Sequence, residues 1–327
     1  MRGAGLVLAP TMATETDVAG LRVYKFGGAS VKDAAGILNV CRIVRETQQG
    51  RPLLIVVSAM GKTTNALEEI FDLSYTEQDH EGPAQVLREY HATTLKALGF
   101  QSPGGPAVVD DSFYALAQQL SQVDTGFSYD ELYDQVVSLG EHMSAGILSL
   151  ALMQTLSSNV VRYLPAVALV RTDESWREGR VNWLETEHLT RQAVTAAFAS
   201  GTQVVVTEGF LGGTADHRTT TLGREGSDYS AAIFAYCLNA ESVTIWKDVP
   251  GLLNADPRIF PDTVLYPEIS YQETIEMAYY GASVIHPKTL QPLAERGIPL
   301  YVKSFLDPAA PGTVIHDCQH PARPSRW

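Results

Sequence analysis

The feature that most constrains the fold is an uninterrupted apolar run, LLIVV, at residues 53–57. A strand that is buried on both faces of a sheet needs such a run, whereas a half-exposed strand alternates apolar with polar residues. A short β-rich run, RVYKF, precedes it at residues 22–26, and helical patterns over 31–48 and 64–73 follow the two runs in turn. Strands that alternate with helices predict a parallel sheet with crossover helices, so we expect an α/β fold.

The rest of the chain extends this pattern. Residues 82–156 are mostly helical in pattern with a loop over 99–106, and residues 250–267 carry four prolines and predict a loop with a short hairpin. Further strands are expected at 160–163, 167–170, 203–207, 219–222, 243–246 and 300–302, and further helices at 228–238, 271–279 and 286–295. No hinge rich in Ser and Gly divides the chain. We predict one two-lobed domain over residues 21–316, between a mobile extension at 1–20 and a tail at 317–327.

Composition disfavours several classes of partner. The 327 residues carry a formal net charge of −13 at pH 7, which argues against nucleic acid and anionic membrane surfaces as partners. No apolar run approaches the ~18 residues that a membrane span needs. The three cysteines are far apart and form no zinc-binding pattern, which is typical of reduced thiols in a cytosol; they are Cys41, Cys237 and Cys318.

Four polar, glycine-rich loops follow apolar strands, and in open α/β sheets ligands bind at the carboxyl ends of the strands. The first, KFGGASV, places Lys25 before two glycines and a helix start, an arrangement that suits a phosphate group but also an ordinary tight turn. The second, SAMGKTTN, is not a P-loop, because Val56 stands where the first glycine of that motif belongs. It predicts a hydroxyl-rich loop for a small polar ligand, or simple helix capping.

The third and fourth loops carry charged groups. Glu141 begins a strongly apolar helix, where it could bind an ammonium group or merely complement the helix dipole. In TTTLGREGSDYSA, Arg224 could grip a carboxylate, and Asp228 could orient a lysine or hold Mg²⁺ through water. A fifth segment, WKDVPGLLNADPR, offers Lys247 and Arg258 to nucleotide phosphates, or is a rigid turn set by its prolines.

Together these motifs resemble the aspartate kinases of the amino acid kinase family. GFLGG at 209–213, GASVIHPKTL at 281–290 and PGTVI at 311–315 occur in the family's order with the loops above, and the resemblance covers residues 21–316. It implies a three-layer αβα sandwich around a mostly parallel eight-stranded sheet. The N-terminal lobe, about 21–215, would hold L-aspartate, and the C-terminal lobe, about 216–316, would hold ATP with Mg²⁺. The product would be 4-phospho-L-aspartate, on the way to lysine, threonine and methionine.

The resemblance also implies roles for individual residues. Lys25 would stabilise the transferred phosphoryl group and Asp228 would organise the phosphate-binding lysine, with no residue assigned to hold a metal directly. The aspartate site would consist of Ser58, Thr64, Glu141, Phe210, Arg224, Gly226 and Ser227. The nucleotide site would consist of Lys25, Gly27, Gly28, Ser30, Lys247, Asp248, Leu253, Arg258, Ser283 and Lys288. A cytoplasmic homodimer is implied too, and the apolar helical residues 131–156 offer a dimer face.

The sequence departs from the family pattern at several points. Glu225 replaces the second glycine of GRGGSD, and we expect its side chain to point outward. Ser283 replaces a lysine of many members, whose charge Lys288 or Lys303 would supply, and Leu253 replaces an aromatic residue. Only residues 317–327 follow the catalytic domain, without the C-terminal ACT regulatory domains of most members. The enzyme could be catalytic only, regulated by another chain, or cut from a longer protein, and we expect L-lysine and L-threonine not to inhibit this chain.

Two alternatives stay open. The chain could be a related acid kinase of the same fold with a shifted substrate. It could also be a catalytically silent ligand-binding subunit, although a silent copy has no chemical need for Lys25 and Asp228.

Overall fold

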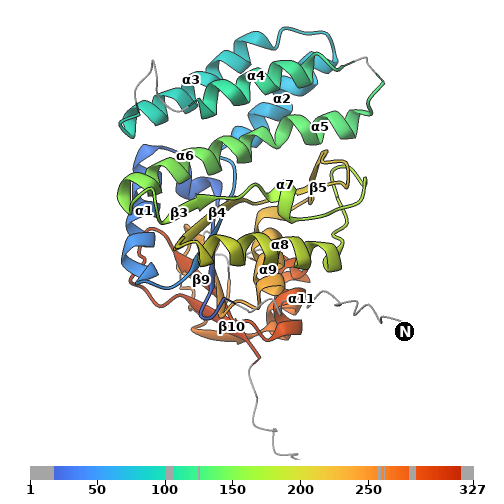
Figure 1. Cartoon of the computed structure of the whole chain (residues 1–327). Coiled ribbons are helices and arrows are strands. Elements are labelled where there is room, and N and C mark those ends of the chain that lie inside the picture. Colours follow the sequence, from blue (N-terminus) through green and yellow to red (C-terminus); the bar gives the residue numbers. More distant parts are fainter. Residues whose placement is uncertain are drawn as a thin grey trace, which may run out of the picture.

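The computed structural model describes residues 18–100, 107–123, 126–255, 259–260, 262–279 and 285–317, and its centre is an eight-stranded sheet (Figure 1). The strand order is β3-β4-β2-β1-β7-β9-β10-β8. Neighbouring strands are parallel except for the antiparallel pair β9–β10. The strands are β1 (Arg22–Phe26), β2 (Leu53–Val57), β3 (Val161–Tyr163), β4 (Val204–Glu208), β7 (Ser242–Lys247), β8 (Glu268–Ser270), β9 (Leu300–Ser304) and β10 (Thr313–His316). The predicted α/β fold and its eight-stranded, mostly parallel sheet are confirmed.

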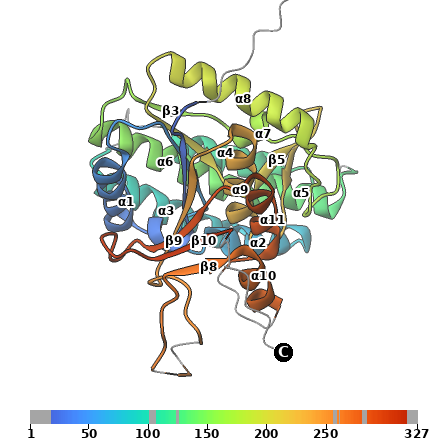
Figure 2. The ribbon, with the colours of Figure 1, turned by 90° about the horizontal axis from the view of Figure 1, so that it is seen from below.

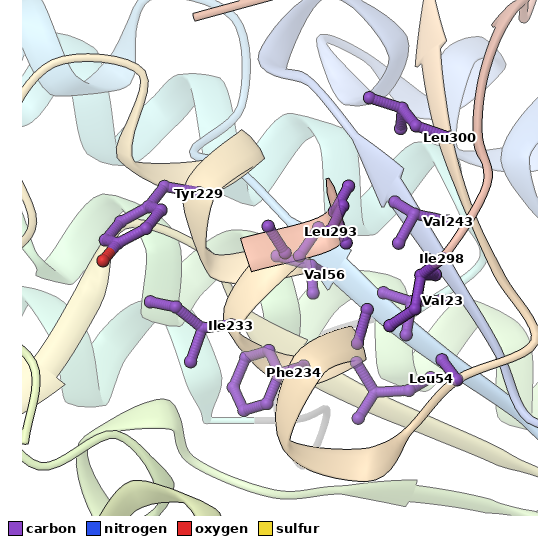
Figure 3. Close-up of a cluster of buried hydrophobic side chains, with 14 of the residues drawn as sticks. Val23, Leu54, Val56, Tyr229, Ile233, Phe234, Val243, Leu293, Ile298 and Leu300 are labelled. Atoms are coloured by element: carbon purple, nitrogen blue, oxygen red, sulfur yellow. The ribbon is translucent and has the colours of Figure 1, made fainter. Parts of the chain in front are cut away.

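Helices cover both faces of this sheet, as Figure 2 shows. Helices α1 (Ala34–Gln48) and α6 (Leu139–Thr155) lie on one face, and α8 (Trp183–Ala199), α9 (Gly226–Leu238) and α11 (Pro287–Arg296) on the other. Side chains of β2 alternate between the two cores, with Ile55 facing α1 and α6 while Leu54 and Val56 face α9 (Figure 3). The central strand is therefore buried on both sides, as its unbroken apolar run predicts.

A further layer of helices lies beyond α6 (Figure 1). It consists of α2 (Thr63–Tyr75), α3 (Glu81–Ala97), α4 (Val108–Leu120) and α5 (Tyr129–Val137), with its own buried apolar cluster. The segment Tyr129–Thr155, which consists of α5 and α6, is long and apolar enough to cross a membrane. However, 78% of its most apolar stretch is buried inside the fold. That burial accounts for the apolar excess that suggested a dimer face at residues 131–156.

Several local predictions were wrong. Residues 167–170 do not form a strand, because α7 (Ala166–Leu169) begins there after Pro165 and the Ala166 N–H donates to the Glu208 carboxylate at 2.7 Å. The helical region 131–156 is divided at Ser138 into α5 and α6. The helix predicted from residue 31 starts later, with α1 capped by Asp33, and a 3₁₀ turn η1 (Gly28–Val31) precedes it. Sequence patterns also missed the short strands β8 and β10.

Other elements agree with the sequence. Helix α10 (Tyr271–Tyr279) was predicted, and the hairpin expected in 250–267 appears as an antiparallel bridge between Leu253 and Leu265. Strands β5 (Leu211–Gly213) and β6 (Thr219–Thr221) form a separate antiparallel pair beside the main sheet. This pair carries the Gly-rich loops toward the carboxyl ends of the parallel strands.

Candidate functional site

A cleft of about 900 Å³ opens at the carboxyl ends of the central strands. Strands β1, β2, β4 and β7 are in register and end side by side, so the loops that follow them meet at one edge. Nine of the predicted residues line this cleft: Lys25, Ser58, Thr64, Glu141, Phe210, Arg224, Gly226, Ser227 and Asp228. The whole predicted aspartate set is thereby brought together with Lys25 and Asp228, although the roles of these residues stay predictions.

The floor of the cleft holds a buried array of charges. The Lys25 ammonium lies 2.6 Å from one oxygen of Asp228, and the Lys247 ammonium lies 3.3 Å from the other. Asp228 sits in the first turn of α9, where the helix dipole favours an anion. Burial alone would raise the pKa of Asp228, but the two lysines outweigh it and hold that pKa below its usual range. The array therefore fixes two cations, from β1 and β7, at one point beneath the cleft.

The first glycine loop packs tightly against the second. A Cβ on Gly28 would lie 2.6 Å from the Ala59 carbonyl oxygen, which no ordinary side chain tolerates, and the Gly61 N–H donates to the Gly28 carbonyl at 3.0 Å. The buried Ser30 hydroxyl donates to the Gly27 carbonyl at 2.6 Å. Ser30 thus shapes the turn beside Lys25 and does not present its hydroxyl to a ligand.

Glu141 also lines the cleft, and its carboxylate forms no ion pair with the described residues. Its side chain is almost fully buried, one oxygen accepts only a long 3.3 Å hydrogen bond from the Ala59 N–H, and the other has no partner in the described chain. Burial raises the pKa of this carboxyl to about 8. A cationic group that entered the cleft would supply the missing partner, which is the chemistry of an ammonium-binding site.

The fourth loop forms the rim. Arg224 and Glu225 are exposed there and both line the cleft, so the outward orientation expected for Glu225 stays a prediction. Glu225 has φ of +56°, a left-handed conformation that glycine adopts at less cost. Behind it, a Cβ on Gly226 would lie 2.5 Å from the Phe210 ring, so this glycine lets the ring pack against α9. The Phe210 N–H is held by the Ser230 hydroxyl at 2.8 Å.

The residues predicted for the nucleotide are more scattered. Lys247 is the last residue of β7, Asp248 follows that strand, and Leu253 lies in the hairpin. Lys288 does not line the cleft: its ammonium donates to the Leu222 carbonyl at 2.9 Å and lies 4.4 Å from the centroid of the Tyr229 ring, so it braces the base of the fourth loop. Arg258 and Ser283 lie outside the described residues. Lys303 stands on β9 with its ammonium 5.7 Å from the Trp246 ring centroid.

One wall of the cleft was not predicted from the sequence. The segment 173–180 contributes Trp176, Arg177 and Glu178, and the helical layer adds Glu68, Asp130 and Tyr133. Arg177 lies 4.1 Å from the Tyr133 ring centroid, and its backbone N–H donates to the buried Asp134 at 2.9 Å. The other loops are recognisable because they combine glycines with a preceding apolar strand, whereas residues 173–180 contain a single glycine. Their signal in the sequence is a high density of charged residues.

Comparisons with known proteins agree with this geometry. The model of the amino acid kinase family matches residues 20–304. The chain is 29% identical over 307 residues to the bifunctional aspartokinase/homoserine dehydrogenase of Buchnera aphidicola, covering 90% of this chain and 36% of that relative. It is 31% identical over 300 residues to aspartokinase 2, chloroplastic, of Arabidopsis thaliana, covering 90% and 54%. The chain thus spans only about a third to about half the length of these curated relatives.

Among solved structures, E. coli aspartokinase III in complex with aspartate and ADP superimposes with a TM-score of 0.80 at 28% identity, covering 92% of this chain and 65% of that one. The same enzyme in complex with lysine and aspartate gives a TM-score of 0.79 at 29% identity, covering 93% and 66%. The similarity extends over both sides of the cleft.

Proposed function

Since the chain belongs to the amino acid kinase family, we propose that it transfers the γ-phosphoryl group of ATP to the side-chain carboxylate of L-aspartate, giving 4-phospho-L-aspartate. The observation that carries the proposal is the buried Lys25–Asp228–Lys247 array in a cleft that also holds the unpartnered Glu141. Relatives named aspartokinases, and a solved relative in complex with aspartate and ADP, support the same pair of substrates.

The acceptor chemistry follows from the groups at the upper part of the cleft. A carboxylate nucleophile is already ionised at neutral pH, since the aspartate pKa is ~3.9, so no general base is needed. Glu141 would pair with the α-ammonium group and Arg224 with the α-carboxylate. These contacts would leave the side-chain carboxylate facing Lys25, and rate enhancement would come from alignment and charge neutralisation.

The donor chemistry would use the buried array. Lys25 would neutralise charge on the transferred phosphoryl group, and Lys247 would contact the nucleotide phosphates, with Asp228 holding both ammonium groups in place. Within the described residues, no group of three or more His, Cys, Asp or Glu side chains is arranged to hold a metal ion. Both Asp228 oxygens already face lysines, so the described part of the chain offers no protein cage. Mg²⁺ would arrive on the ATP phosphates, where it neutralises charge.

Further parts of the proposal follow from the family. We place the reaction at the start of the route to lysine, threonine and methionine, in the cytoplasm, and propose that two copies of the chain form a homodimer. These points rest on the resemblance and are tested by metabolite feeding, fractionation and light scattering.

The first experiment is a hydroxamate assay with MgATP and L-aspartate on the full chain. Lys25→Ala should lower the rate by ~10²–10³-fold, because one preorganised electrostatic group is lost. Lys96→Ala, which removes an exposed lysine on α3, is the matched control and should keep the rate. If the folded chain forms no hydroxamate but releases ADP with another acid, the substrate assignment is wrong.

A further inference from the structure

A second group of charges, the buried Glu208 and the partly exposed His142, lies next to Glu141 at the carboxyl end of β4. Glu208 is fully buried and receives three hydrogen bonds. His142 Nδ1 donates to it at 2.6 Å, the Ala166 N–H donates at 2.7 Å, and the Tyr163 hydroxyl donates to the same oxygen as His142. His142 follows Glu141 on α6, which lies across β3 and β4 in Figure 1. The proposed reaction assigns no role to this group.

The charges of the three neighbouring residues are coupled. Burial works against the charge on Glu208, but the imidazole of His142 outweighs it and lowers the pKa of that carboxyl. Burial likewise opposes the charge on His142, but Glu208 outweighs it and raises the pKa of the imidazole. Each member of the pair, 2.6 Å apart, thus favours the charged form of the other.

The net charge of the His142–Glu208 pair affects the pKa of Glu141. A negative Glu208 raises the pKa of Glu141, and a positive His142 lowers it, so the two effects oppose each other only while His142 keeps its proton. Among the described residues, the groups that act on the His142 ring are Glu208 of β4 and Glu141 of its own helix, and Tyr163 of β3 shares the Glu208 oxygen. An unprotonated His142 would leave Glu141 facing an uncompensated buried anion.

We propose that His142 is a positioning residue for the acceptor: as an imidazolium it neutralises Glu208, and this allows Glu141 to carry the negative charge that holds the substrate's ammonium group. This inference rests on the proposed function, because it assigns Glu141 to the α-ammonium of an amino acid. The His142–Glu208 pair would thus influence which substrate binds, although neither residue lines the cleft.

The test separates charge from hydrogen bonding. His142→Gln keeps a side-chain donor for Glu208 but removes the cation, so the KM for L-aspartate should rise about tenfold, which corresponds to one pKa unit at Glu141. The KM for ATP should not change. The pH above which kcat/KM for aspartate reaches its plateau should move upward by about one unit.

The double variant His142→Gln/Glu208→Gln removes both charges and should regain most of the lost affinity for aspartate. A purely structural role for the pair predicts the reverse, since a second change in a buried cluster would add to the damage. A double variant that binds aspartate as weakly as the single variant, or more weakly, overturns the proposal.

A matched control exists at the far edge of the sheet. His316 of β10 lies 2.7 Å from Glu268 of β8, an exposed pair of the same chemistry, and His316→Gln should leave the KM for aspartate unchanged. If His142→Gln does not fold, NMR titration of the His142 ring in the unmodified chain decides the question. A ring pKa above the usual 6.5 that falls in Glu208→Gln supports the proposal, and a ring pKa at or below 6.5 overturns it.

The two proposals fail in different ways. An unmodified chain that makes no aspartyl hydroxamate refutes the aspartate kinase function. An active unmodified chain whose His142→Gln variant keeps its KM and its pH profile refutes only the positioning role.

Discussion

Two buried carboxylates stand in the same cleft with opposite electrostatics. Asp228 lies against two lysines, at 2.6 and 3.3 Å, and its pKa is lowered. Glu141 forms no ion pair among the described residues, and the nearby His142 offsets only part of the burial that raises its pKa to about 8. The first site is electrostatically complete before any ligand binds, whereas the second lacks a positive partner. The comparison separates a carboxylate that organises the protein's own cations from one that, in the proposed function, would receive a cation from a substrate.

The largest effect is expected when Asp228 loses its negative charge. Asp228→Asn would leave the buried Lys25 ammonium and the partly buried Lys247 ammonium without an anion. We therefore expect the free energy of unfolding to fall by ~3 kcal/mol and phosphoryl transfer to fall with it. Chemical denaturation measures the first and the hydroxamate assay the second.

Asp134→Asn is the matched control for this change. Asp134 is equally buried, but its carboxylate accepts hydrogen bonds from the backbone of Arg177 and Thr221 and from the Thr221 hydroxyl, which an amide can largely satisfy. If both variants lose equal stability, the two lysines are not what distinguishes Asp228.

The second-largest effect is expected when Glu141 loses its negative charge. Glu141→Gln should raise the KM for L-aspartate ~10–100-fold with little change in the KM for ATP, because a charge-assisted bond to the ammonium group is lost. In the unmodified chain, kcat/KM for aspartate should rise with pH and level off above a pKa of about 8, as Glu141 ionises. The variant should lack that titration; a variant that retains it would assign the titration to another group.

A smaller effect lies in the pH dependence of stability, where the two carboxylates have opposite signs. Between its usual pKa of 4.5 and its folded pKa of about 8, Glu141 keeps a proton in the folded chain that the unfolded chain has lost, so its contribution to stability falls as pH rises through this window. Asp228 has a lowered folded pKa, so its contribution is present above the usual 3.8 and is lost as pH falls toward the folded value.

Denaturation curves at several pH values test these signs. The stability of Glu141→Gln relative to the unmodified chain should increase as pH rises from about 5 to about 9. A difference that stays constant with pH would show that Glu141 is already ionised in the folded chain.

The smallest effect concerns Glu225, a third carboxylate that is exposed at the rim. Its φ of +56° is unfavourable for a residue with a Cβ, so Glu225→Gly should stabilise the chain by ~0.5 kcal/mol, the cost of the left-handed backbone less the added entropy of glycine. Glu77, at φ of +55° and outside the cleft, gives the control: Glu77→Gly should stabilise similarly. Only Glu225→Gly should also change the KM for ATP.

Sequence patterns were sufficient for the parts of the molecule that depend on local chemistry. The apolar run of β2 defined the central strand, and the loops after β1, β2 and β4 had to converge because parallel strands end at the same edge. Charged residues next to glycine-rich loops, such as Lys25 at the end of β1 and Asp228 at the start of α9, were therefore identifiable as candidates from the amino-acid sequence.

The parts that escaped prediction depend on contacts between distant segments. The β-branched residues at 167–170 favour a strand, but Glu208, some forty positions later, accepts the Ala166 N–H at 2.7 Å and helps to begin α7. Likewise, Asp134 fixes Arg177 in the cleft wall by a hydrogen bond that spans 43 positions. The His142–Glu208 pair, separated by 66 positions, has no sequence signature at all.

The extra helical layer beyond α6 has a consequence for how such a protein can diversify. Of the residues that line the cleft, Thr64 and Glu68 come from α2 and Asp130 and Tyr133 from α5, whereas Lys25 and Asp228 come from β1 and α9. Under the proposed function, part of the acceptor site would therefore lie in a helical layer outside the sheet, and the residues proposed to bind the phosphoryl donor lie on the sheet and on the helix packed against it. Sequence changes confined to the helical layer α2–α5 could therefore alter which acid is phosphorylated without changing the residues proposed to bind the phosphoryl donor.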